Sequence, residues 1–316
     1  MNKPILGAIA IALCALSARA NCGSTSCPID VNALQIFSRY SLDLSFQSID
    51  QNQPRIGTRK AAVGEIASDH DEIETVNHIA TLQFAYAPSS RFQLALSAPF
   101  VSRTHKHFDT ESQELERWSF SDFGDAVIQA RTRVRPSLWL TTGVKLPTGS
   151  EHETSDNGED AEVTITPGTG STDLLLGLTY ESGVVRDTSL AGPLGHATSI
   201  PYFVAVNYRI NGRGREDYRR GNELQLNAGS EYPLTARLHV LGQINARLMS
   251  KDDVGNTDED RNLTGGRYLY LSPGLRLLLG DRTSAYAFVQ LPLYQHVNGL
   301  QLTSKANYAM GVRRQF

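Results

Sequence analysis

The stretch ELQLNAGSEY (residues 223–232) decides the fold class, because apolar and polar side chains alternate along it. Leu224 and Leu226 fall on one side of an extended strand, and Glu223 and Gln225 fall on the other. A soluble sandwich would bury the apolar side, whereas a membrane barrel would turn that side toward lipid. A single strand is compatible with both architectures, so the number and length of the other strands must separate them.

Similar alternation recurs along the chain and predicts about twelve strands of roughly ten residues, the length that a tilted membrane strand needs. Strands of soluble sandwiches usually run for about five or six residues. The segments are 36–47, 76–86, 92–100, 125–134, 138–146, 173–180, 202–210, 223–232, 238–248, 268–279, 284–294 and 305–313. Segment 284–294 is apolar on both faces, so the sequence leaves its register open.

Connections between these segments alternate in length. Short turns are predicted at residues 88–91, 135–137, 233–236 and 280–283. Long polar links are predicted at residues 47–71, 103–121, 148–170, 211–221 and 251–267. The link at 188–198 breaks this rhythm, because it is longer than the other turns at its end. The rhythm is typical of outer-membrane barrels. It predicts an all-β, antiparallel up-and-down transmembrane barrel over residues 35–316.

The first twenty residues are typical of a cleaved export signal. Lys3 supplies the positive start, residues 5–16 are apolar, and residues 18–20 read Ala-Arg-Ala, a cleavage site that predicts a mature chain from Asn21. A lipoprotein signal is disfavoured, since Leu13 occupies the position where a small residue should precede the lipidated cysteine. Because there is no apolar run long enough for a spanning helix, only a closed barrel could cross a membrane.

Residues 21–34 are predicted to form a periplasmic segment that contains a cysteine pair, Cys22 and Cys27. Two cysteines in an oxidising compartment favour a disulfide. A soft-metal site is the alternative, but the neighbouring sequence offers no third cysteine or histidine ligand.

The end of the chain carries a second targeting feature. Phe316 is the last residue, Gly311 lies shortly before it, and Tyr308, Met310 and Val312 alternate with polar residues. This pattern resembles the terminal signal that the barrel-assembly machinery reads in outer-membrane proteins, with Arg314 as a departure from it. We therefore expect this machinery and outer-membrane lipid to be partners of the chain, and the outer membrane of a Gram-negative bacterium to be its location.

Charged residues on the polar faces are the candidates for function. Acids and bases nearly balance, with a formal net charge of -3, which argues against a nucleic-acid partner. The alternation places the following side chains toward the lumen: Asp125, Arg131, Arg133, Lys145, Asp173, Arg209, Glu223, Glu231 and Arg247. Two interpretations stay open, a polar constriction that selects permeants and mutual neutralisation within a narrow barrel.

Two motifs go beyond a generic barrel, GVKLPTGS (residues 143–150) and TPGTGSTDLLLGL (residues 166–178). Together they resemble the MetA-pathway of phenol degradation family of outer-membrane proteins. That resemblance implies uptake of small organic compounds, aromatic ones among them, and supplies no catalytic residues. From the residues alone, Gly149, Gly168 and Gly170 would permit positive φ at the rim, and a loop frame is favoured over direct contact with a substrate.

Two further features have competing interpretations. Acidic runs occur at residues 151–162 and 252–260, where calcium binding competes with plain solvation, and solvation is favoured. His105 and His107 share one strand face, but two histidines without a third ligand seldom hold a metal, so neither a metal nor a cofactor is expected.

The favoured function is therefore passive passage of small molecules through a barrel, without catalysis. One alternative is an outer-membrane enzyme of the phospholipase type, for which His78 on an apolar face would need a nearby serine. Another is a non-conducting structural or adhesive barrel. The sequence does not determine the permeant, the ion selectivity or the oligomeric state.

Overall fold

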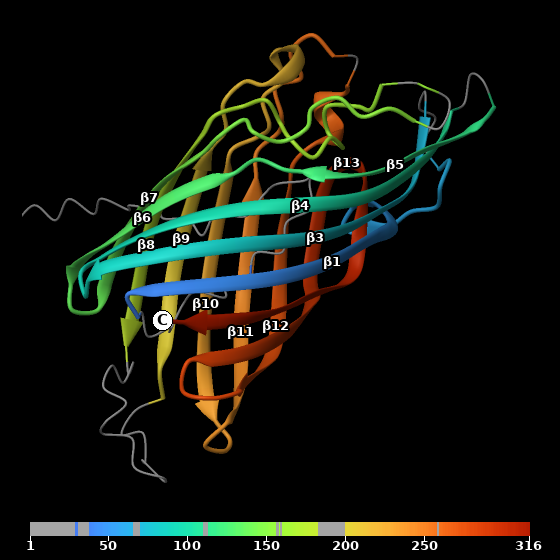
Figure 1. The fold of residues 1–316 in the computed structure, drawn as a ribbon. Coiled ribbons are helices and arrows are strands. Elements are labelled where there is room, and N and C mark those ends of the chain that lie inside the picture. The colour runs from blue at the N-terminus through green and yellow to red at the C-terminus, as the bar shows by residue number, and fades with distance from the viewer. Residues whose placement is uncertain are drawn as a thin grey trace, which may run out of the picture.

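In the computed structural model, the chain forms a closed antiparallel β-barrel with long, tilted strands (Figure 1). The structure describes residues 29–30, 38–65, 70–109, 113–155, 158, 160–182, 200–257 and 259–316. The predicted all-β barrel is thereby confirmed. Among the described residues, no helix has the length and apolarity to cross a membrane.

Consecutive strands are neighbours around the wall, and β13 pairs with β1 to close it. The strands are β1 (Tyr40–Gly57), β2 (Arg59–Lys60), β3 (His70–Ser89), β4 (Phe92–Asp109), β5 (Leu115–Phe123), β6 (Val127–Arg135), β7 (Leu138–Lys145), β8 (Asp173–Ser182), β9 (Tyr202–Ile210), β10 (Glu223–Pro233), β11 (Leu238–Met249), β12 (Gly266–Leu278) and β13 (Thr283–Gln315). Two short 3-10 turns lie in links, η2 (Arg215–Asp217) and η3 (Arg261–Leu263).

Three details reconcile these elements with the predicted number of strands. β5 and β6 pair with successive parts of β4, so together they fill one strand position around the wall, which we call a stave. β13 reverses near Gly299: its first half pairs with β12 and its second half with β1. Gln315 N, at the end of β13, donates to Arg282 O, just before its start, at 2.8 Å. With β2 a two-residue edge piece, the wall has the twelve staves that the sequence predicts.

Burial along the strands is inverted relative to a soluble protein. On β10, Glu223 and Asn227 are buried, whereas Leu226 and Tyr232 are exposed on the outside. The outer surface is thus an apolar belt, and the interior is polar. The ambiguous segment 284–294 is resolved in the same way, with Tyr286, Phe288 and Gln290 buried and Val289 and Leu291 exposed.

Strands extend further than the sequence predicts. The links expected at 47–71 and 103–121 are largely strand, because β1 continues to Gly57, β4 to Asp109, and β5 begins at Leu115. Beyond the apolar belt, water can contact both faces of a sheet, so the alternation that reveals a strand is no longer required. The strands therefore continue to pair through their backbones in a region where the sequence shows no alternation of apolar and polar residues.

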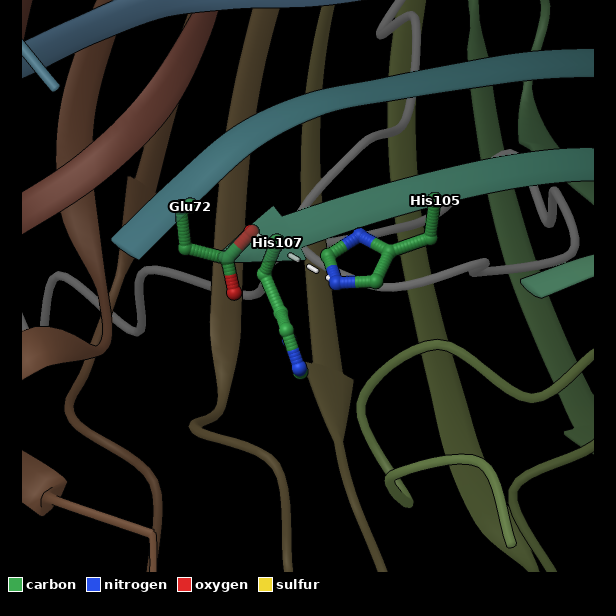
Figure 2. Close-up of side chains that lie close together, drawn as sticks. All are labelled: Glu72, His105 and His107. Atoms are coloured by element: carbon green, nitrogen blue, oxygen red, sulfur yellow. Dashed lines mark ion pairs between the residues drawn. The ribbon is translucent and has the colours of Figure 1, made fainter. Parts of the chain in front are cut away.

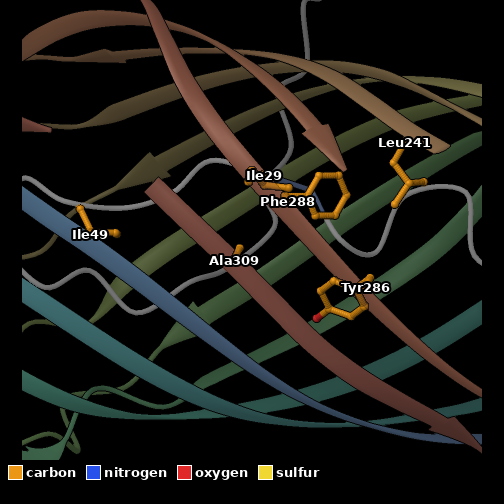
Figure 3. Close-up of a cluster of buried hydrophobic side chains, with 6 residues drawn as sticks. All are labelled: Ile29, Ile49, Leu241, Tyr286, Phe288 and Ala309. Atoms are coloured by element: carbon orange, nitrogen blue, oxygen red, sulfur yellow. The ribbon is translucent and has the colours of Figure 1, made fainter. Parts of the chain in front are cut away.

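Part of the N-terminal segment lies inside the barrel. Ile29 is fully buried in a cluster with Ile49, Tyr286 and Phe288 (Figure 3). Asp30 N donates to Gln243 Oε1 at 3.0 Å, and Gln243 Nε2 donates to Asp30 O at 2.9 Å. Two residues of the segment predicted to be periplasmic therefore occupy the lumen, while Cys22, Cys27 and the predicted signal lie outside the described residues.

The chain terminus also has a structural role. Phe316 N donates to Tyr40 O at 2.9 Å, which joins the end of β13 to the start of β1, and the Phe316 side chain is exposed on the outer surface. A Cβ on Gly311 would lie 2.5 Å from the Tyr286 hydroxyl oxygen. Gly311 therefore makes room for an aromatic side chain in the lumen, in addition to its predicted place in an assembly signal.

Deletion of Phe316 should lower the yield of folded barrel more than its stability. One exposed interfacial side chain contributes at most about 2 kcal/mol through burial, whereas the terminal signal is expected to act during assembly. We expect a large loss of heat-modifiable protein in cells and a small shift in the urea midpoint of the purified remainder. Leu234→Ala, at an exposed turn position, is the control. Normal cellular yield after the deletion would contradict the assembly role.

Candidate functional site

The candidate lumen residues have their side chains inside the barrel, and the structure sorts them into separate groups. All are buried except Arg131 and Arg133, which are partly exposed. Most pair with an opposite charge within hydrogen-bond distance, so the interior is an ion-paired network rather than an unscreened ring of charge. We call the end of the barrel with links 90–91, 136–137, 234–237 and 279–282 the short-turn end, and the opposite end the long-loop end.

Lys145 is the centre of the first group, at the end of β7. Its Nζ lies 2.6 Å from Asp125 Oδ2 and 3.4 Å from Asp173 Oδ2, and it donates to the hydroxyls of Thr169 and Ser171. Asp125 accepts from the backbone amides of Gly149 and Thr169, both at 3.0 Å. Both motifs that sequence analysis singled out therefore meet here, and the lysine and the two aspartates hold the two ends of one loop together.

This mouth loop, the link between β7 and β8 (residues 146–172), depends on a contact between two glycines. A Cβ on Gly168 would lie 2.5 Å from the carbonyl carbon of Gly149, so only hydrogen fits between the two backbones. Of the three glycines that would permit positive φ, Gly170 adopts it, at +65°, whereas Gly149 and Gly168 do not. At those two positions glycine is required by the close approach of backbone, which sequence spacing does not reveal.

From this base the mouth loop folds across the long-loop end. Arg215 donates to the carbonyl oxygens of Glu151 and Ala161. Ala161 and Ile165 are buried against Trp118 and Phe120, the inward residues of β5. The loop thus contacts the link between β9 and β10 on one side and β5 on the other, which places it over the mouth of the barrel.

A second group lies toward the short-turn end. Arg131 Nη2 is 3.1 Å from Glu181 Oε1, and Trp139 Nε1 donates to Glu181 Oε2 at 3.0 Å. The guanidinium carbons of Arg131 and Arg133 lie 5.0 and 4.3 Å from the Trp139 ring centroid, within the range of cation–π attraction. This arrangement combines positive charge with an aromatic face.

Two more groups lie on the strands that follow around the wall, β9 to β12. Glu223 Oε2 is 2.9 Å from Arg247 Nη2, and Arg209 lies directly opposite Glu223 on β9. Near the short-turn end, Glu231 contacts His239 Nδ1 at 2.6 Å and also binds Arg276. In these groups opposite charges are paired, and the choice between mutual neutralisation and a selective constriction stays a prediction.

Several interior residues were missed by the sequence analysis. Trp139 occupies the same strand face as Thr141 and Lys145, so the alternation could have placed it in the lumen. Its partner Glu181 lies two positions beyond Thr179, on the polar face of β8, and was detectable in the same way. Asp43 and Arg313, 2.9 Å apart, join β1 to β13. That pairing follows from barrel closure and had no local signal.

The acidic runs combine exposed carboxylates, such as Asp160 and Asp260, with others that are partly or fully buried at the long-loop end. Asp252 is buried and accepts from the Tyr218 hydroxyl and the Gly221 amide. Burial, followed by the Asp252 charge, raises the pKa of Tyr218. Glu259 has its pKa raised to about 8 by burial and then by the neighbouring charges of Glu162 and Asp252. Carboxylates from separate links are therefore forced together at the long-loop end.

The barrel is similar in fold to known membrane barrels. An outer membrane channel from Pseudomonas putida F1 matches with a TM-score of 0.60 and 11% identity, over 91% of this chain and 100% of that one. The translocator domain of autotransporter NalP from Neisseria meningitidis (TM-score 0.47, 10% identity, 88% of each chain) and the CymD monoaromatic hydrocarbon channel (TM-score 0.46, 7% identity, 90% of each chain) overlap less closely. No family model and no curated protein matches the sequence. Identities this low show a shared fold alone, and the family resemblance stays a prediction.

The structure also bears on the phospholipase-type alternative. His78 lies on the outer face opposite Ser102 of the neighbouring strand. Its ring stacks on Phe46 with centroids 5.7 Å apart, while Ser102 Oγ accepts a hydrogen bond from Ser121 at 2.8 Å. A serine nucleophile requires its hydrogen bond to the base. In this structure neither of these contacts joins the serine to the histidine.

Proposed function

We propose that this protein is an outer-membrane channel for small organic molecules, which pass through the polar lumen under the control of the mouth loop. The outer surface supports the membrane location. Its exposed leucines and phenylalanines form a belt, and aromatic residues gather at strand ends near the short turns, as in the interfacial girdle of membrane barrels. The exposed members of that girdle are Tyr40, Tyr180, Tyr202, Tyr232 and Phe316.

The observation that carries the channel proposal is the anchored mouth loop. Lys145, Asp125 and Asp173 form a fully buried charge cluster that holds this loop over the mouth of the polar barrel. A non-conducting structural barrel has no need to position a loop there, whereas a channel needs a constriction that determines which molecules pass.

The chemistry of the lumen supports organic rather than purely ionic permeants. The lumen contains buried aromatic side chains together with buried hydrogen-bonding ones, and Tyr268, Tyr270 and Gln295 lie close together there. Such a surface suits a compact ring with one polar substituent. The motif resemblance to the MetA-pathway of phenol degradation family points to the same class. Arg131 and Arg133, near the short-turn end, are our candidates for setting charge preference.

Reconstituted protein should render liposomes permeable to phenol-sized solutes and exclude large sugars. The expected readout is fast isosmotic swelling with small neutral aromatics, slow swelling with disaccharides, and a measurable conductance in planar bilayers. Absence of both swelling and conductance would favour the structural-barrel alternative. Lipid hydrolysis by the same preparation, abolished by Ser102→Ala and by His78→Gln, would favour the enzyme alternative.

A further inference from the structure

Two histidines and a glutamate meet inside the barrel near the long-loop end, beside the carboxylates of Glu162 and Glu259 described above. His105 and His107 project inward from β4, and Glu72 projects from the neighbouring strand β3 (Figure 2). One nitrogen of each histidine and one carboxylate oxygen of Glu72 all lie within 4.8 Å of one another. The His105 Nε2 atom lies 3.7 Å from Glu72 Oε2. Both imidazoles are buried.

A shift in strand pairing brings the third residue into this cluster. Thr75 pairs with His105, but Glu72 pairs with His107, because the register shifts by one residue between Glu72 and Glu74. With continuous register Ile73 would face His107, and Glu72 would point away from the lumen. The bulge therefore adds a third ligand to the pair of histidines. The sequence alone showed no third ligand, and for that reason it argued against a metal site.

Each histidine has its other ring nitrogen held by a neighbouring side chain. Thr75 Oγ1 lies 2.9 Å from His105 Nδ1, and Glu116 Oε2 lies 2.6 Å from His107 Nε2. These contacts direct His105 Nε2 and His107 Nδ1 toward the shared space. In metal sites the second ring nitrogen of a ligating histidine is almost always held in this way, by a carboxylate, carbonyl or water, which fixes the tautomer and the ring orientation.

A fourth candidate ligand comes from the mouth loop. Glu162 Oε1 lies 3.9 Å from His107 Nδ1. Glu162 and Glu259 both accept from the hydroxyl of Thr164, at 3.1 and 3.5 Å. The carboxylate of Glu259 therefore lies close to that of Glu162. Carboxylates gathered in one partly buried place repel one another, and a divalent cation would offset that repulsion.

We propose that His105, His107 and Glu72 form a site for a divalent transition-metal ion, completed by Glu162 from the mouth loop. Imidazole nitrogens with carboxylate oxygens suit zinc and its neighbours in the first transition series. Zinc bonds of about 2.0–2.2 Å put tetrahedral ligand atoms roughly 3.4 Å apart. The ligand atoms of His105, His107 and Glu72 lie within 4.8 Å of one another, which is wider than this, so side-chain adjustments of about an ångström would complete the coordination. The bound ion would fasten the mouth loop to the wall at a point distinct from the Lys145 anchor.

Calorimetric titration of the folded, detergent-solubilised protein with zinc tests the site directly, without reference to transport. We expect one zinc ion per chain. Glu72→Gln, His105→Gln and Glu162→Gln should each weaken binding at least tenfold, and Thr75→Val should weaken it by about tenfold through loss of orientation alone. His239→Gln is the matched control, because His239 also contacts a glutamate, and among the described residues it belongs to no cluster of three possible metal ligands.

Folding of each variant is checked by its heat-modifiable mobility, so that a misfolded barrel is not counted as loss of a ligand. Absence of stoichiometric zinc binding by the parent protein, or equal binding by parent and His105→Gln, would overturn the site. Unchanged binding by Glu162→Gln would overturn the participation of the mouth loop. Zinc binding without measurable conductance would count against the channel and leave the metal site standing, so the two proposals fail separately.

Discussion

Replacement of Lys145 by Met should release the mouth loop and give the largest single-residue increase in conductance. The substitution leaves Asp125 and Asp173 as buried carboxylates without their cation, and the side chain of Lys145 is only 1% exposed. Breaking a buried ion pair by removing one partner typically costs about 3–5 kcal/mol. We expect a several-fold higher conductance, a lower urea midpoint, and new cleavage at Glu151 or Glu162 by a glutamate-specific protease.

Two comparisons separate release of the loop from general damage. Lys60→Met removes the same charge from an exposed position on β2 and should change neither readout. The triple change Lys145→Met, Asp125→Asn and Asp173→Asn removes all the charges together, so stability should partly return while the loop stays accessible to protease. A protected mouth loop in Lys145→Met would show that the anchor does not hold it.

Introduction of a single methyl group at Gly168 should also release the mouth loop, through a steric clash instead of the loss of a charge. In Gly168→Ala the new Cβ would lie 2.5 Å from the backbone of Gly149, and backbone atoms cannot move aside as a flexible side chain can. Overpacking of this kind costs about 1–3 kcal/mol. We expect an intact barrel with raised conductance and increased cleavage within the mouth loop.

The control for this change is Gly242→Ala on β11, where an added Cβ would meet no atom within 4 Å. That variant should match the parent protein in conductance, protease resistance and urea midpoint. If Gly168→Ala also matched the parent, the close contact between the two loop ends would not be what positions the mouth loop.

The candidate metal site shows where sequence reasoning stops short. Alternation places His105 and His107 on one face without any knowledge of neighbours. Glu72 enters only through the one-residue register shift between β3 and β4, and Glu162 only through the inward course of the mouth loop. A bulge changes which face of the sheet a residue occupies while leaving the local sequence pattern almost unchanged. The third and fourth ligands were therefore not detectable from spacing.

The lumen charges show the same division. Alternation indicates which side chains point inward, because successive side chains of a strand point to opposite faces. It does not tell which opposite charges meet. Lys145 binds aspartates on both sides of its strand, and Asp43 meets Arg313 from the other end of the chain. The charged lumen residues that were candidates for one selectivity surface form separate ion-paired groups. One of these groups anchors the mouth loop.

The sequence by itself determined the barrel class, the number of staves and the inward face of nearly every strand. Those properties follow from local covalent geometry, since a period of two residues and strands long enough to span lipid are visible without knowing any contact. Only the tertiary structure decided the longer reach of β1, β4 and β5, the burial of Ile29 in the lumen, and the inward course of the mouth loop. Each of these depends on packing between residues far apart in the chain, where apolar contact, register and paired charge select one arrangement from many that the local pattern allows.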